Sequence, residues 1–221
     1  MFLKNTELYD NLKSLHPKAL GNVDVLDKFI RHCVGLRVKR QLVRADAPKD
    51  IWGGLQAVQY PDELASMLAY MHDKDIKNYL EIGCAHGGTF FTVDSFLRAC
   101  NPAFEGSLAV DPFPRIEDKG KLKEYQSKFP TALYFKGKSS DLTIDKVWDF
   151  VLIDGDHNYT GIKFDFELMK NHAKYIALHD IYLRSGVKTV WSEIKKSYKT
   201  VEFQSKDPIF LYPVGMGIAE L

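Results

Sequence analysis

The chain has 221 residues, of which 45% are hydrophobic and 27% charged, and its formal net charge is +1 at pH 7. This composition is typical of one globular domain with a modest addition. The near-neutral charge disfavours nucleic acid as a partner. Three widely spaced cysteines suggest neither a disulfide framework nor zinc, and no apolar run reaches the length of a membrane span. We therefore predict a cytoplasmic protein with no nucleic-acid or membrane partner. The sequence leaves the oligomeric state open, a homo-oligomer included.

The N-terminal quarter of the chain is the least regular part. Apolar residues recur at helical spacing over 23–30, and a basic run covers 37–44. We interpret the basic run as a solvated helix face; contact with a phosphate or an anionic substrate is the less favoured alternative. Trp52-Gly53-Gly54 indicates a break. We predict that residues 1–55 form a helical cap and that residues 56–221 form the main domain.

From Tyr60 onward, helical and extended patterns alternate along the chain. Helical periodicity covers the segments 61–71, 90–97, 117–128, 162–169 and 187–194. Strands are predicted at 78–82, 108–110, 133–136, 149–153 and 175–178, with 201–204 and 209–212 as two final strands and a last extended piece at 217–219. This order predicts an α/β fold: a Rossmann-like, doubly wound, mostly parallel seven-stranded sheet with an antiparallel C-terminal edge. Ligands of such sheets bind beyond the carboxyl ends of the strands.

The turn after the first strand has the pattern E-x-G-x-x-x-G-G-T, over Leu80–Thr89. Small residues there let the backbone approach a ligand, and the next helix presents free N–H groups to it. The pattern resembles motif I of class I methyltransferases that use S-adenosylmethionine (SAM). The resemblance implies that the turn wraps the methionine part of SAM, with contacts from Glu81, Gly83, Ala85, Gly87 and Thr89. An ordinary strand-to-helix turn and another nucleotide-binding family are the alternatives.

The ends of the second and third strands also carry candidate cofactor contacts. Asp111 can accept both hydrogen bonds of a ribose diol, although an Asp before Pro also suits a plain turn. The segment Ser139-Ser140-Asp141 follows the third strand. The same resemblance implies an adenine contact there, and a helix N-cap is the alternative reading.

Ionisable residues gather after the fourth and fifth strands. Asp154, Asp156 and His157 follow one strand, and His179 and Asp180 end the next. Because neighbouring parallel strands end at the same edge, we expect Asp154, His179 and Asp180 to lie together. Carboxylate oxygens with open positions suit Mg²⁺ or a similar divalent cation.

The chain from Gln59 to its C-terminus resembles a narrower group, the metal-assisted sugar O-methyltransferases of the macrocin type and the related cephalosporin-hydroxylase-like proteins. That resemblance implies that Asp154 and the pair 179–180 hold the metal and that Asp156 is the general base. The chain departs from the group at His179, where an acid is usual, which removes one negative charge. His157 is a second candidate base. A structural, hydrogen-bonded role is the alternative for both histidines.

Together these features predict a SAM-dependent O-methyltransferase that acts on a small molecule, a sugar or another acceptor with vicinal oxygens, with the help of a divalent metal. Two alternatives remain at this point. One is a metal-dependent, hydroxylase-like enzyme on the same fold, which would need a second histidine ligand for iron. The other is a protein that binds SAM without catalysis, as an assembly or binding module.

Overall fold

The computed structural model describes residues 2–38, 40–49 and 51–221. Within these residues, strands and helices alternate and the strands form one seven-stranded sheet in the order β3-β2-β1-β4-β5-β7-β6. All neighbouring strands are parallel except β7, which runs antiparallel to both β5 and β6. The predicted α/β fold class is confirmed. The strands are β1 (Asn78–Ile82), β2 (Gly106–Val110), β3 (Ala132–Phe135), β4 (Trp148–Ile153), β5 (Ala173–His179), β6 (Lys199–Phe203) and β7 (Met216–Glu220).

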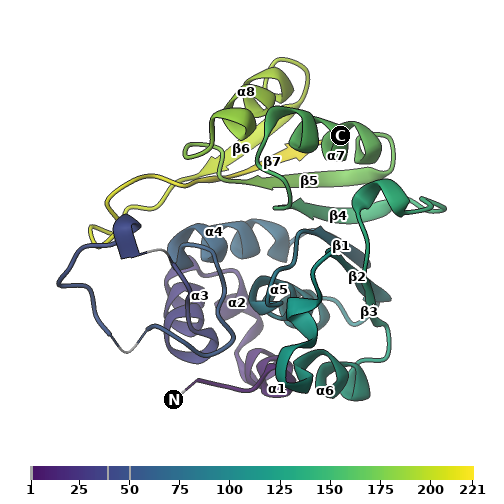
Figure 1. Cartoon of the computed structure of the whole chain (residues 1–221). Helices are drawn as coiled ribbons and strands as arrows, with labels where there is room; N and C mark the ends of the chain where they lie inside the picture. The colour runs from purple at the N-terminus through teal and green to yellow at the C-terminus, as the bar shows by residue number, and fades with distance from the viewer. Residues whose placement is uncertain (1, 39, 50) are drawn as a thin grey trace.

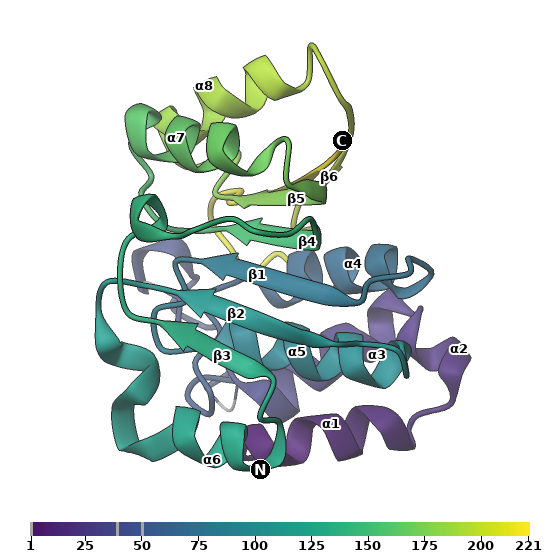
Figure 2. The same ribbon diagram turned by 90° about the vertical axis from the view of Figure 1, so that its right-hand side faces the viewer.

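Helices cover both faces of the sheet (Figures 1 and 2). Successive side chains of a strand point to opposite faces: Tyr79 and Phe150 pack toward α1 and α3–α6, whereas Leu80 and Val151 pack toward α7 and α8. In the described part of the chain, no helix is both long and apolar enough to cross a membrane. The α-helices are α1 (Asn5–Ser14), α2 (Pro17–Leu20), α3 (Val23–Phe29), α4 (Pro61–His72), α5 (Gly88–Cys100), α6 (Lys121–Lys128), α7 (Tyr159–Met169) and α8 (Ser185–Ile194).

The C-terminal edge differs from the prediction in one element. The antiparallel edge exists, but its second strand is β7, and the predicted strand at 209–212 makes only an isolated bridge between Phe210 and Val43. The connection between β6 and β7 is held instead by α4. Glu63 of α4 accepts hydrogen bonds from the backbone N–H groups of Ser205 and Gly215. These contacts fix the connection as a loop against α4 and keep it out of the sheet.

The N-terminal segment shares one hydrophobic core with the sheet. Leu8 of α1 and Leu26 of α3 are fully buried in the same cluster as Leu64 of α4 and Phe90 of α5. The boundary at 55/56 stays a prediction. The expectation of a helix face over the basic run is wrong, because only a short 3₁₀ turn at Arg40–Leu42 interrupts an otherwise irregular segment; Lys39 lies outside the described residues.

Candidate functional site

The strand order places the expected ligand crevice where β1 borders β4. From β1 the chain proceeds outward to β2 and β3, and it later returns to the other side of β1 with β4 and β5. Such a switch point opens a crevice at the carboxyl ends of the two central strands. Gly83 follows β1 at φ +90°, and a Cβ there would lie 2.4 Å from the backbone oxygen of Asp154. Glycine is therefore required for the turns after β1 and β4 to lie against each other.

The turn from Gly83 to Gly88 is shaped by small residues. Ala85 and Gly87 also have positive φ, at +45° and +81°. Gly88 begins α5, and a Cβ there would lie 2.5 Å from both Leu55 O and Ala57 N. The backbone of the N-terminal segment is thus seated directly on the start of α5. Thr89, the last predicted contact in this turn, is buried. The turn leads directly into the N-terminus of α5, the kind of element that presents backbone N–H groups to an anionic or polar ligand.

Glu81 lies beneath this turn, inside the protein. It is 1% exposed and accepts a hydrogen bond from the Tyr79 hydroxyl. Burial raises the pKa of Glu81 to about 8, and the nearby carboxylates of Asp154 and Asp111 act in the same direction. The side chain therefore keeps a proton at neutral pH more readily than an ordinary glutamate does.

Asp111 connects the turn after β2 to the turn after β1. Its Oδ2 accepts a hydrogen bond from Ala85 N at 2.9 Å, and its Oδ1 accepts one from Phe113 N at 2.8 Å. The hydrogen bond from Phe113 N is the contact expected if Asp111 serves only to form a turn. A carboxylate has further lone pairs for a ribose hydroxyl, so the predicted ribose contact and the turn role are compatible.

The segment predicted to contact adenine forms a 3₁₀ turn, Ser139–Asp141. Asp141 accepts a hydrogen bond from Lys138 N at 3.0 Å, which is a capping contact, and Ser140 donates to Asp141 at 3.3 Å. Ser139 donates to Asp165 of α7 at 2.5 Å. Lys138, and neither Ser140 nor Asp141, is the N-cap residue, while Asp141 makes the reciprocal contact from the third position of the turn; the adenine contact of all three residues stays a prediction.

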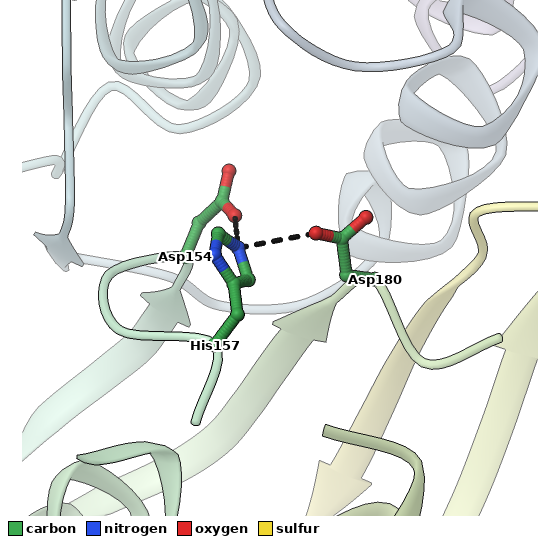
Figure 3. A group of neighbouring side chains, drawn as sticks. All are labelled: Asp154, His157 and Asp180. Carbon is green, nitrogen blue, oxygen red and sulfur yellow. Dashed lines mark hydrogen bonds and ion pairs between the residues drawn. The ribbon is translucent and has the colours of Figure 1, made fainter. Parts of the chain in front are cut away.

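Three ionisable side chains meet at the ends of β4 and β5 (Figure 3). His157 Nε2 lies 3.1 Å from Asp154 Oδ1 and 3.1 Å from Asp180 Oδ2. One ligand atom from each residue falls within 4.8 Å of the other two, so the group could hold a metal ion. Asp180 has φ +64°, which L-residues adopt rarely. The hydrogen bond to Asp154 raises the pKa of His157, against the effect of burial.

His179 lies behind Asp154, outside this group of three. It is 5% exposed, and its Nδ1 is 3.2 Å from Asp154 Oδ1 and 3.8 Å from Asp180 Oδ1. Burial disfavours the charged ring, but the carboxylates of Asp154, Asp180 and Glu63 outweigh it and raise the pKa of His179 to about 9. Its Nε2 is buried and has no hydrogen-bond partner among the described residues. Asp154, His179 and Asp180 therefore lie together as expected, and His157 joins the two carboxylates as well; the role of His179 as a ligand stays a prediction.

Gln59 completes the surroundings of Asp154. Its Nε2 donates to Asp154 Oδ2 at 2.8 Å, while its Oε1 is buried without a partner in the described part of the chain. The carboxylate of Asp154 therefore has contacts on both oxygens, and the two histidines hold its pKa well below the usual range despite burial. The sequence analysis did not select Gln59 as a site residue. Its position just before the Pro61 start of α4, within the stretch of family resemblance, was the available signal.

Asp156, the predicted base, points toward solvent. Its Oδ1 accepts hydrogen bonds from the backbone and side-chain nitrogens of Asn158, both at 2.9 Å, and so orders the turn before α7. Asp156 and His157 nevertheless line one cavity of about 370 Å³, together with Asn158, Arg184 and Ser185. A molecule bound there would contact both candidate bases.

The segment 80–181 matches a family model described as a methyltransferase domain. Among solved structures, an O-methyltransferase from Bacillus cereus in complex with S-adenosylhomocysteine (SAH) is similar over 98% of this chain and 96% of its own, with TM-score 0.57 and 12% identity. An O-methyltransferase from Streptomyces achromogenes involved in tomaymycin synthesis, in complex with SAM, covers 75% of this chain and 81% of its own, with TM-score 0.56 and 13% identity.

An N-methyltransferase from Bradyrhizobium japonicum in complex with SAH covers 79% of this chain and 93% of its own, with TM-score 0.53 and 13% identity. A search of curated proteins found no match. At these identities the solved structures establish the fold, whereas the acceptor atom differs among them. The matched segment contains the turn after β1 and the ends of β4 and β5. The segment 80–181 is thus similar to a methyltransferase domain, and the chain has the fold of these SAM-dependent methyltransferases.

Proposed function

We propose that the protein transfers a methyl group from SAM to a hydroxyl of a small molecule with vicinal oxygens, assisted by a divalent cation. One observation carries this proposal: Asp154, His157 and Asp180 meet at the same crevice that the turn of Gly83 borders. The proposal includes the acceptor class, the metal and the narrower resemblance to macrocin-type enzymes. It also includes a cytoplasmic location and the absence of a nucleic-acid partner.

The residues around the first turn fit SAM. Gly83, Gly87 and Gly88 let the turn pack closely against neighbouring protein atoms, and the turn leads directly into the N-terminus of α5, as expected for a strand-to-helix turn that presents backbone N–H groups to SAM. Asp111 lies at the next strand end, within reach of a ribose. The Streptomyces protein holds SAM and the Bacillus protein holds SAH, and both are O-methyltransferases of this fold. These similarities support SAM as the methyl donor.

The donor set of the group after β4 and β5 fits a divalent cation. Two carboxylates suit Mg²⁺ or Mn²⁺, and the imidazole of His157 extends the range toward Mn²⁺ and other transition metals. Asp154, His157 and Asp180 would hold the ion. When bound, such a cation lowers the pKa of a hydroxyl that contacts it.

The remaining residues orient groups and accept the proton. Gln59 and His179 fix the carboxylate of Asp154 from two sides. Asp156 accepts the proton of the acceptor hydroxyl in the cavity that it shares with His157. The oxygen then attacks the SAM methyl in line, and the C–S bond breaks as the C–O bond forms, which leaves a neutral thioether. Holding both reactants in line is worth up to about 7–11 kcal/mol in well-oriented systems.

The test is transfer of labelled methyl from SAM to a panel of sugars and catechols, with and without EDTA. We expect turnover that EDTA abolishes and that Asp154→Asn reduces by at least 100-fold, whereas Asp145→Asn leaves it unchanged. Asp145 is an exposed acid just before β4, at the amino end of the strand and so at the opposite end from Asp154. Turnover that survives both chelation and Asp154→Asn contradicts metal assistance.

Two other functions are outcomes of the same experiments. Calorimetry that shows SAM and metal binding without turnover on any acceptor would favour a binding module. The hydroxylase alternative needs two histidines and one carboxylate around iron, and the candidate group among the described residues contains one histidine and two carboxylates. We therefore favour methyl transfer.

A further inference from the structure

A second and larger cavity lies within the N-terminal segment. Its volume is about 750 Å³, inside the usual range for small-molecule pockets. The residues that line it come from 36–56 and include three cationic side chains, Arg37, Arg44 and Lys49, together with the ring of Trp52. Among the described lining residues there is no carboxylate. The described lining therefore combines three cationic side chains, of which Arg44 pairs with Asp46, with an aromatic surface.

The charge of Arg37 is held at the cavity wall by neutral partners. Its Nη1 donates to Gln56 Oε1 at 3.2 Å and contacts His86 Nε2 at 2.5 Å. Because a guanidinium can only donate, His86 must accept with Nε2 and carry its proton on Nδ1, which lies 3.5 Å from Asp118. Burial and the charge of Arg37 lower the pKa of His86, which keeps the ring neutral. These contacts orient Arg37 without cancelling its charge.

The cavity wall is linked to the predicted SAM turn by a side-chain contact and to the predicted metal group along the chain. His86, the partner of Arg37, belongs to the turn between Gly83 and Gly87. Gln56 lines the cavity, and three residues later Gln59 donates to Asp154. One short stretch of chain therefore connects the cavity wall to the predicted SAM turn and to the predicted metal group.

We propose that this cavity holds a carboxylate or phosphate group of the methyl acceptor, with a flat apolar part against Trp52, while the reacting hydroxyl of the same acceptor lies at the cavity of Asp156 and His157. The inference rests on the proposed function and adds a substrate class to it. Arginine and lysine are the residues that recognise carboxylates and phosphates. Arg44 also pairs with Asp46 at 3.1 Å, and that exposed pair can open to an anionic ligand. SAM also carries a carboxylate, in its methionine part, that the same cationic side chains would recognise. Measuring SAM affinity beside acceptor affinity distinguishes these two ligands of the cavity.

The experiment measures binding without turnover, by calorimetry on the full chain with Mn²⁺ present. Two matched pairs serve as probes: 3,4-dihydroxybenzoate against 3,4-dihydroxybenzyl alcohol, and glucose 6-phosphate against glucose. The variant is Arg44→Gln/Lys49→Gln. Its control is Lys123→Gln/Lys188→Gln, which removes the same charge from exposed positions on α6 and α8. SAM affinity is measured on every protein.

We expect at least one anionic probe to bind more than tenfold tighter than its neutral counterpart. The double variant should lose this preference, while the control variant keeps it and SAM affinity stays the same. Equal or absent binding of the anionic and neutral probes, or a preference that survives in the double variant, overturns the proposal. A loss of SAM affinity also overturns it and assigns the cavity to the cofactor.

If the double variant fails to fold, the single variant Lys49→Gln, at an exposed position, is measured in its place and judged by the same criteria. Because no methyl transfer is needed, failure of the proposed function leaves the binding result readable. Turnover on neutral acceptors alone would retain the methyltransferase function and reject the anionic acceptor.

Discussion

His179 Nδ1 lies 3.2 Å from Asp154 Oδ1, on the side of Asp154 that faces the protein interior. The pair puts a buried positive charge against a carboxylate that also contacts the predicted metal position. Such a contact fixes the carboxylate and favours its charged form. His179 is thus placed to orient Asp154, whereas His157 is placed to be a ligand.

Replacing His179 should destabilise the fold more than replacing an exposed histidine. In His179→Asn the carboxylate of Asp154 loses its buried cationic partner, and breaking a buried pair costs about 3–5 kcal/mol. We expect a loss near the lower figure, because His157 still contacts Asp154. Urea denaturation measures the change in the free energy of unfolding, with the exposed His32→Asn as control. A change below about 0.5 kcal/mol would show that the pair contributes little.

Two glycines with positive φ form a matched test of the SAM turn. Gly83→Ala places a Cβ 2.4 Å from Asp154 O, whereas Gly120→Ala, at φ +72°, meets nothing within 4 Å. Both variants pay the strain of a left-handed residue, about 1–2 kcal/mol. Only Gly83→Ala must also push the turns after β1 and β4 apart. We expect it to weaken SAM binding at least tenfold in calorimetry, with Gly120→Ala unchanged. Equal SAM affinities in the two variants would exclude the turn as the cofactor cradle.

The free energy of unfolding should fall as pH rises between about 5 and 8. The folded protein holds the pKa of Glu81 at about 8, against an ordinary value of 4.5, because the side chain is buried. The folded state therefore binds more protons than the unfolded state in this window, and stability is lost as pH rises through it. The raised pKa of His179, about 9, has the same sign at higher pH.

Glu81→Gln keeps a hydrogen-bond acceptor for Tyr79 and removes the titration. Urea denaturation at pH 5, 7 and 9 should therefore give a shallower decline in this variant than in the wild type, most clearly between pH 5 and 7. The same slope in both proteins would mean that Glu81 is charged in the folded state throughout.

We expect His157 to act in metal binding and its neighbour Asp156 to act in proton transfer. His157→Gln removes a predicted ligand and should weaken Mn²⁺ binding more than tenfold in calorimetry. Asp156→Asn leaves the group of three intact, since Asp156 contacts Asn158 instead. It should keep Mn²⁺ affinity and lower kcat by about 10²–10⁴-fold on an acceptor that the panel identifies. Normal kcat in Asp156→Asn would remove it as the base, and unchanged Mn²⁺ affinity in His157→Gln would remove that residue as a ligand.

The sequence predicted the sheet because its signals are local and mutually consistent. Apolar runs such as 149–153 alternate with helical periodicity, and the structure confirms a strand at each of the first five predicted positions. The segment 209–212 has the apolar character of a strand but is held outside the sheet. Its position outside the sheet depends on Glu63, more than 140 residues earlier in the chain, because Glu63 binds the two ends of the loop. No local pattern carries that information.

The site shows the same division. The sequence placed Asp154 and Asp180 at neighbouring strand ends, where they are found together. It named His179 as the histidine of the metal group, whereas the three side chains that one metal position could join include His157, because side-chain direction depends on backbone angles. His179 is the last residue of β5 and points into the core, whereas Asp180 leaves the strand at φ +64°. His157 reaches the group from the turn after β4, a reach that spacing along the chain does not specify.

The contact of Leu55 and Ala57 backbone with Gly88 bears on how this enzyme could be re-engineered. The chain that lines the cationic cavity continues without interruption into the stretch pressed against the start of α5. Exchanging the N-terminal segment between related proteins would therefore transplant part of the cofactor turn's support along with any acceptor preference. A productive chimera would need its junction after Gln59, so that Leu55, Ala57 and the donor to Asp154 travel together.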